Sequence, residues 1–169
     1  ETNKVKPPII NMPKLRPIPI VTRGLPFWRK VWVLLTAQRQ WELVDNWVFM
    51  LPCGVYIIIP KGFIMDGAST PKFMWGILDP TGILLLQGIV HDYGYRFDYL
   101  WAYDNDRQLY KLYGGRGRKF WDDLFLAIGR DVVDLQVTGY LSYGMLRLLG
   151  WIAWNKNRKL NQADIIIYY

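Results

Sequence analysis

The chain has 169 residues, of which 51% are hydrophobic and 16% aromatic, enough for a domain with its own core, and this composition excludes a disordered protein. Its single cysteine, Cys53, excludes an internal disulfide and a zinc site built from several cysteines. Any bound metal must therefore be held mainly by oxygen atoms and by His91, the one histidine.

The net charge of +7 is concentrated near the N-terminus, where residues 1–30 carry seven basic side chains against one acidic residue, Glu1. Six of the ten prolines fall within residues 1–26, and proline removes backbone donors and interrupts helices. We predict that residues 1–26 form an extended basic Pro-rich arm that is ordered mainly by partner subunits. Such an arm can bind a protein groove, anionic lipid or nucleic acid, or remain solvated, and the alternating residues 17–21 favour a protein groove.

The remainder of the chain is nearly neutral, which argues against nucleic-acid binding outside the arm. The chain begins with Glu1 rather than Met, so we expect a processed, trimmed or partial chain. Its first residues lack the apolar core of a signal peptide.

The segments that follow the arm are rich in β-branched and aromatic residues and are separated by short polar or Pro-containing turns. This pattern predicts three or four antiparallel strands in a meander with one buried face, over residues 31–36, 40–44, 47–51 and 54–63.

From Thr70 onward the hydrophobic spacing becomes helical. A short apolar piece at residues 73–78 comes first, and the spacing then predicts longer helices over residues 82–96, 105–113, 120–130 and 137–154. The basic glycine loop before the third of these helices is best interpreted as a flexible turn.

The last predicted helix approaches the length of a membrane span, but Arg147 in its middle and three interior glycines argue against one. Residues 161–169 are expected to form a C-terminal strand or tail that can pair with a neighbouring subunit. We thus expect an α+β fold, in which a small antiparallel meander and a helical bundle form a single domain over residues 27–160.

The segment with the clearest chemical content surrounds His91. Asp92 follows it directly, and Tyr95 lies one helical turn further on, so a helix places His91 and Tyr95 on the same face. Together these side chains supply a titratable base, a ligand for a hard cation and a hydrogen-bonding partner. The alternative is that His91 is a buried structural residue whose hydrogen bonds are satisfied.

A second acidic group comes from the predicted helix over residues 105–113. If that helix packs antiparallel to the His91 helix, Asp106 can orient His91 as the carboxylate orients the base in hydrolases. The alternative role of Asp106 is to favour a helix N-terminus, with Asp104 as an equal candidate for the cap. Asp66 is a further candidate metal ligand beside His91, although its segment can equally serve to begin a short helix.

Three separated sequence motifs follow one another along the chain. They are Gly62-Phe63-x-x-Asp66-x-Ala68-Ser69-x-Pro71, then His91-Asp92-Tyr93-x-Tyr95, then Asn105-Asp106. In this order they resemble the phage-encoded domain-of-unknown-function family 1353 over roughly residues 54–150. The resemblance implies an origin in a tailed phage or prophage, and it implies no specific activity.

The segment His91-Asp92-x-x-Tyr95, followed by Asp106, is also similar to the active-site helix pair of phospholipases A2. This resemblance implies that His91 is the general base and that Asp92 binds Ca²⁺ or another divalent cation. It also implies that Asp106, helped by Tyr95, fixes the tautomer of His91. The glycine-rich calcium loop and the disulfides of those enzymes have no counterpart in this sequence.

These observations keep two classes of function open. The first is a virion protein of the tail, neck or baseplate region, whose arm and C-terminal strand bind other phage proteins. The second is an enzyme that uses His91, Asp92 and Asp106 on an ester or amide of the host envelope lipid or cell wall. The two are compatible, and we expect a virion component that carries a hydrolase-like site.

Overall fold

The computed structural model describes residues 11–36, 40–65, 84–104, 106, 108–131 and 136–160. Four helices and seven strands form an α+β fold, as the sequence predicts. In chain order they are β1 (Leu15–Ile18), α1 (Phe27–Thr36), β2 (Gln40–Leu43), β3 (Trp47–Met50), β4 (Tyr56–Ile59), β5 (Ile64–Met65), α2 (Leu85–Phe97), β6 (Leu100–Tyr103), β7 (Leu109–Leu112), α3 (Arg118–Asp131) and α4 (Gln136–Leu160).

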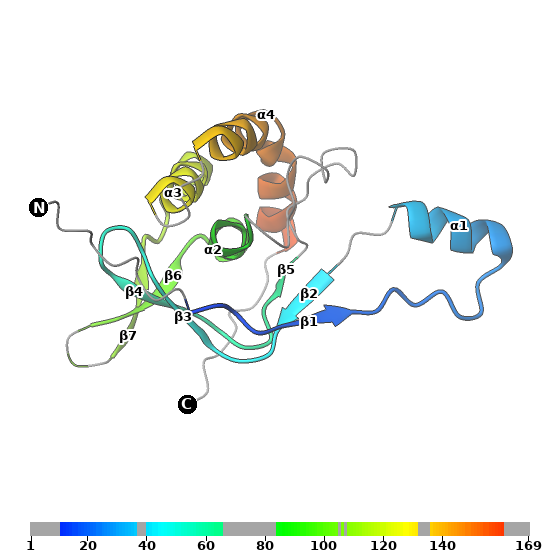
Figure 1. Ribbon diagram of the computed structural model, residues 1–169, viewed down its shortest axis with the longest axis horizontal. Helices are drawn as coiled ribbons and strands as arrows, with labels where there is room; N and C mark the ends of the chain where they lie inside the picture. Colours follow the sequence, from blue (N-terminus) through cyan, green and yellow to red (C-terminus); the bar gives the residue numbers. More distant parts are fainter. Residues whose placement is uncertain are drawn as a thin grey trace, which may run out of the picture.

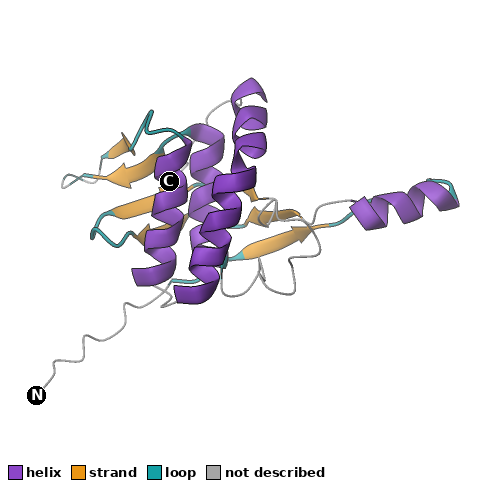
Figure 2. Cartoon of the chain, turned by 90° about the horizontal axis from the view of Figure 1, so that it is seen from above, coloured by secondary structure: helices purple, strands orange, loops and turns teal. Residues whose placement is uncertain are grey.

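The strands form two antiparallel sheets rather than the predicted single meander. One sheet has the order β1-β2-β5 and the other β3-β4-β6-β7, so strands that follow α2 in the chain complete the second sheet. Helix α2 packs on the strands with one side and on α3 and α4 with the other, and the three helices lie side by side over the sheets (Figure 2).

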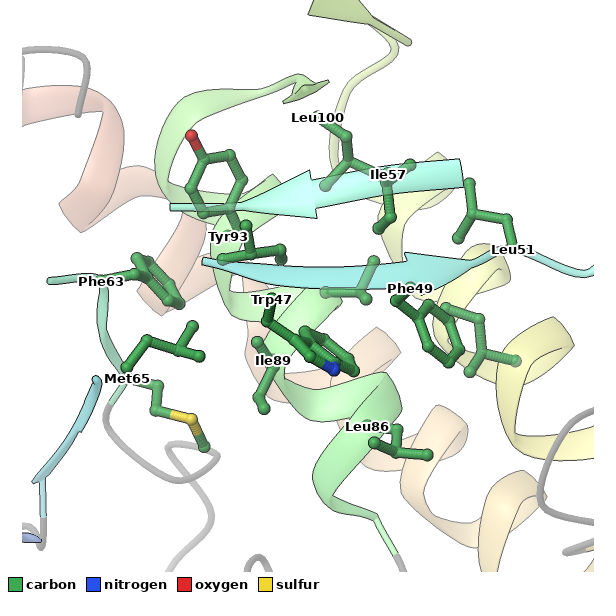
Figure 3. Close-up of a cluster of buried hydrophobic side chains, with 14 of the residues drawn as sticks. Trp47, Phe49, Leu51, Ile57, Phe63, Met65, Leu86, Ile89, Tyr93 and Leu100 are labelled. Carbon is green, nitrogen blue, oxygen red and sulfur yellow. The ribbon is translucent and has the colours of Figure 1, made fainter. Parts of the chain in front are cut away.

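The core fills the space between the sheets and α2. Trp47, Phe49 and Ile57 of the β3–β4 hairpin meet Ile89 and Tyr93 of α2, and Figure 3 shows these side chains converging from both elements. Burial of such large apolar side chains is the main force that holds α2 against the sheet.

Two segments adopt a different structure from the one that their sequence predicts. Residues 31–36 belong to helix α1 and not to a strand, and residues 109–112 form strand β7, paired with β6, and not a helix. The predicted helices over 82–96, 120–130 and 137–154 are confirmed as α2, α3 and α4.

Part of the predicted extended arm pairs with the chain's own sheet, because residues 15–18 form a strand. These residues form β1, an edge strand that pairs antiparallel with β2, where Pro17 is tolerated and Arg16 forms an ion pair with Glu42 directly opposite. The expected short helical piece at 73–78 and the C-terminal strand lie outside the described residues. Within the described part of the chain, no helix has the length and apolar character that a bilayer span requires.

Candidate functional site

A row of polar side chains runs along the face of α2 that meets α3. Gln87, His91 and Tyr95 are spaced four residues apart, so the helical repeat places them one above another, and all three are buried. The close approach of α3 is possible because Gly94 has no side chain, since a Cβ there would collide with the Trp121 ring. On α4, Gly150 likewise leaves room for the Tyr95 hydroxyl.

Asp122 of α3 is the centre of the site and is completely buried. Its Oδ1 lies 3.0 Å from His91 Nε2 and also accepts a hydrogen bond from the Tyr95 hydroxyl. Its Oδ2 accepts a hydrogen bond of 2.9 Å from Arg147 of α4, and the Arg118 guanidinium lies 3.8 Å away. One carboxylate therefore connects all three packed helices.

The charges of this cluster support one another. Burial by itself disfavours the charged form of His91, but the hydrogen bond to Asp122 and the charge of Asp92 outweigh it, so the pKa of His91 is raised above its ordinary value. Burial also disfavours the Asp122 carboxylate, yet hydrogen bonds from His91, Tyr95 and Arg147 hold its pKa below the ordinary value. Burial and then the bond to Asp122 raise the pKa of Tyr95, so its hydroxyl remains a donor.

Two buried polar groups next to His91 lack partners. Both amide atoms of Gln87 are buried without a hydrogen bond among the described residues, and Oδ2 of Asp92 is in the same state. The other oxygen of Asp92 lies 3.8 Å from His91 Nδ1, which is too far for a hydrogen bond but close enough for charge attraction. An unsatisfied buried polar group costs stability, so each of these groups needs a partner such as a water molecule, an ion or a ligand.

The structure brings together some of the predicted site residues and separates others. His91, Asp92 and Tyr95 lie at one site, as their spacing predicts. Asp106 does not contribute to it, because it lies exposed in the β6–β7 turn, where its backbone N–H donates to Asp104 Oδ1. Asp66 lies outside the described residues.

Sequence reasoning missed Asp122, which binds His91, and Arg147, which binds Asp122, although both carried a signal. Asp122 falls on the apolar stripe of α3, between Trp121 and Phe125, where a carboxylate needs a buried partner. Arg147 interrupts an otherwise apolar helix. Its charge argues against a membrane span, but it also indicates an acidic partner on a neighbouring helix. Its partner is Asp122.

A bound cation would find few ligands in the described part of the chain. Asp92 offers one unpartnered oxygen, but no three His, Cys, Asp or Glu side chains gather there in a way that could hold a metal ion. Ca²⁺ takes six to eight oxygen ligands, so the described residues alone do not form its coordination shell.

The comparisons with known proteins give one match. The model of the family described as "Protein of unknown function (DUF1353)" matches residues 41–143. This range includes His91, Asp92, Tyr95 and Asp122, whereas Arg147 and α1 lie beyond it. The searches of the curated proteins and of the solved structures found no match.

Proposed function

Because this chain belongs to the DUF1353 family, whose description names no activity, we propose its function from the site itself: a virion-associated hydrolase of a tailed phage that cleaves an ester or amide of the host envelope. The observation that carries the proposal is the shared use of Asp122 Oδ1 by His91 Nε2 and the Tyr95 hydroxyl. The phage context is supported by the resemblance of the sequence motifs to a phage-encoded family.

The arrangement is suited to general-base catalysis by His91. With the Nε2 proton donated to Asp122, the neutral imidazole keeps its lone pair on Nδ1, on the side of Asp92. Nδ1 would take a proton from water as the oxygen attacks the carbonyl carbon, and would then return it to the departing alkoxide or amine. Asp122 holds the ring in this tautomer, and both carboxylates stabilise the imidazolium that forms.

Gln87 is the side chain best placed to contact the substrate. It lies one turn before His91 on the same face, and its amide N–H groups have no partner among the described residues. An unpartnered donor of this kind can stabilise the negative charge that develops on a carbonyl oxygen during hydrolysis.

A second candidate function is structural, and the burial of His91 favours it. Only 5% of the His91 side chain is exposed, and Asp122 is bound by two arginines as well as by His91. In this role the cluster fixes α2, α3 and α4 in a virion protein that binds other phage proteins through its arm and its C-terminal segment, with no reaction at the site.

Replacement of His91 separates the two functions. We expect the wild-type chain and the Asp106→Asn control to hydrolyse phospholipid vesicles or a soluble ester, and His91→Gln to lose activity about 100-fold or more while circular dichroism shows a folded protein. Wild-type activity should rise with pH through an apparent pKa above 6.5, because the base must be deprotonated. Assays with Ca²⁺ and with a chelator measure any requirement for a cation. If the wild-type chain hydrolyses no substrate with Ca²⁺ or with the chelator, the hydrolase proposal is wrong and the structural function remains.

Gln87→Met provides an independent test. The substitution removes a buried amide that has no hydrogen-bond partner among the described residues. Whether or not Gln87 contacts a substrate, the free energy of unfolding should therefore stay unchanged or rise by about 1–3 kcal/mol. If Gln87 contacts the substrate, hydrolysis by this variant should fall despite the unimpaired fold. Unchanged kcat/KM would remove Gln87 from the mechanism.

A further inference from the structure

Helix α1 stands apart from the other helices that the structure describes. It extends beyond the end of the β1–β2 pair, well away from α2, α3 and α4 (Figures 1 and 2). Among the described elements, α1 packs extensively against no other helix or strand. A ten-residue helix is marginal in water on its own, so a surface that covers one of its faces would stabilise it.

Three of the exposed side chains of α1 are large and aromatic. Phe27 is 68% exposed, Trp28 80% and Trp32 68%. Trp28 and Trp32 are one turn apart, and Phe27 packs edge-on against Trp28, so the three rings form one aromatic surface. At 100° per residue, Arg29 and Lys30 lie away from the centre of this surface and border it, each about 60° from one of its rings.

The charge around this helix is uniformly positive. No acidic residue occurs between Glu1 and Glu42. Lys14 and Arg16 form ion pairs with Asp45 and Glu42. Arg23, Arg29 and Lys30, which lie in α1 or shortly before it, are exposed and form no ion pair with any described residue.

We propose that α1 binds the surface of an anionic lipid bilayer, with Phe27, Trp28 and Trp32 in the interface and Arg29 and Lys30 at the level of the lipid phosphates. A helix with aromatic rings on one side and cations at the border of that side matches the apolar and anionic layers of such a surface. Trp is suited to this depth because its ring is apolar and its N–H can stay hydrated.

A nucleic acid fits these residues less well. Bases that stacked on Trp28 and Trp32 would leave Lys30 on the far side of the helix, away from the phosphates, whereas stacking platforms present rings and cations along one groove. The lipid proposal does not depend on hydrolysis at His91, although lipid binding would bring the site to the envelope.

The test uses the full-length chain and vesicles of phosphatidylcholine with or without phosphatidylglycerol. We expect sedimentation with the anionic vesicles, little with the neutral ones, and a blue shift of Trp fluorescence on binding. Trp28→Ala combined with Trp32→Ala should weaken binding roughly tenfold or more. Arg29→Gln combined with Lys30→Gln should weaken it by about fivefold for each charge at low salt.

Two control variants make the result specific. Trp151→Ala removes an exposed tryptophan of α4 and should leave binding unchanged. His91→Gln should also bind as the wild type does, so a failure of the hydrolase proposal does not affect this measurement. Absence of wild-type binding, equal binding by the double Trp variant, or binding to DNA but not to vesicles would each overturn the proposal.

Discussion

Asp122 is a buried carboxylate whose two oxygens contact side chains from α2 and α4, so the cost of removing it from water is offset by specific donors. A buried ion pair of this kind adds little net stability compared with apolar residues of similar volume. Its disruption, however, leaves uncompensated polar groups in the interior. At the scale of single residues, the site therefore depends on the charge of Asp122 more than on the charge of any exposed acidic residue.

Asp122→Asn should lower the free energy of unfolding by about 3–5 kcal/mol, because His91, Tyr95 and Arg147 lose their common acceptor charge. Asp106→Asn makes the same chemical change at an exposed turn and should stay within about 0.5 kcal/mol of the wild type. Urea denaturation of both variants provides the measurement. Equal effects of the two substitutions would contradict the central role of Asp122.

His91 should make stability depend on pH in a defined direction. Its pKa in the folded protein is raised above 6.5, so its contribution is fully present below the unfolded value and is lost as the pH rises through the folded value. The free-energy difference between wild type and His91→Gln should therefore shrink as the pH rises above 6.5. Denaturation curves from about pH 5 to about pH 9 test this, and a difference that grows with pH would contradict it.

The sequence alone was sufficient to predict the local part of the site and insufficient for the distant part. His91, Asp92 and Tyr95 belong to one helix, so their spacing predicts their proximity. The carboxylate that orients His91 depends on which helix packs against α2. Residues 109–112 form a strand and not the predicted helix. The helix that packs against α2 is therefore α3, and it supplies Asp122 in place of Asp106.

At the scale of elements, the contact between α2 and α3 depends on Gly94. A methyl group there would meet the ring of Trp121, which is fully buried and donates a hydrogen bond to Asp98 at the end of α2. The Trp121 ring thus has little freedom to move away.

Gly94→Ala should destabilise the protein by roughly 1–3 kcal/mol, because the strain of overpacking exceeds the gain in helix propensity. Gly88→Ala lies on the same helix with open space around it, and it should stabilise the protein by about 0.5–1 kcal/mol. Thermal or urea denaturation distinguishes the two, and a stable Gly94→Ala variant would show that α3 can shift at little cost.

Secondary structure was predictable where amphipathic spacing and length agreed, as in α2, α3 and α4. The run at residues 31–36 is rich in β-branched residues and predicts a strand, yet it continues from Phe27 as a helix with Trp28 and Trp32 on one face. Residues 109–113 have helical spacing, but antiparallel pairing with β6 decides their structure, and Lys111 stacks on Tyr99 and Trp101. Tertiary pairing overrides local preference in such short segments.

At the scale of the whole molecule, the packed core and the charged N-terminal part differ in how much of their aromatic surface is buried. The sheets, α2, α3 and α4 bury the aromatic and aliphatic side chains and position Asp122. Helix α1 carries exposed rings and cations and contributes nothing to that core. Composition predicted the positive N-terminal charge, but only the structure shows that the aromatic residues beside it stay exposed.

The cluster at Asp122 also has a consequence for the order of folding events. Its members come from positions as far apart as His91 and Arg147, so it can form only after three helices have docked. Tyr95→Phe, which removes one hydroxyl from the cluster, should therefore accelerate unfolding roughly tenfold while it leaves the refolding rate nearly unchanged. Stopped-flow chevron plots measure both arms, and slower refolding would mean that the cluster forms before the transition state.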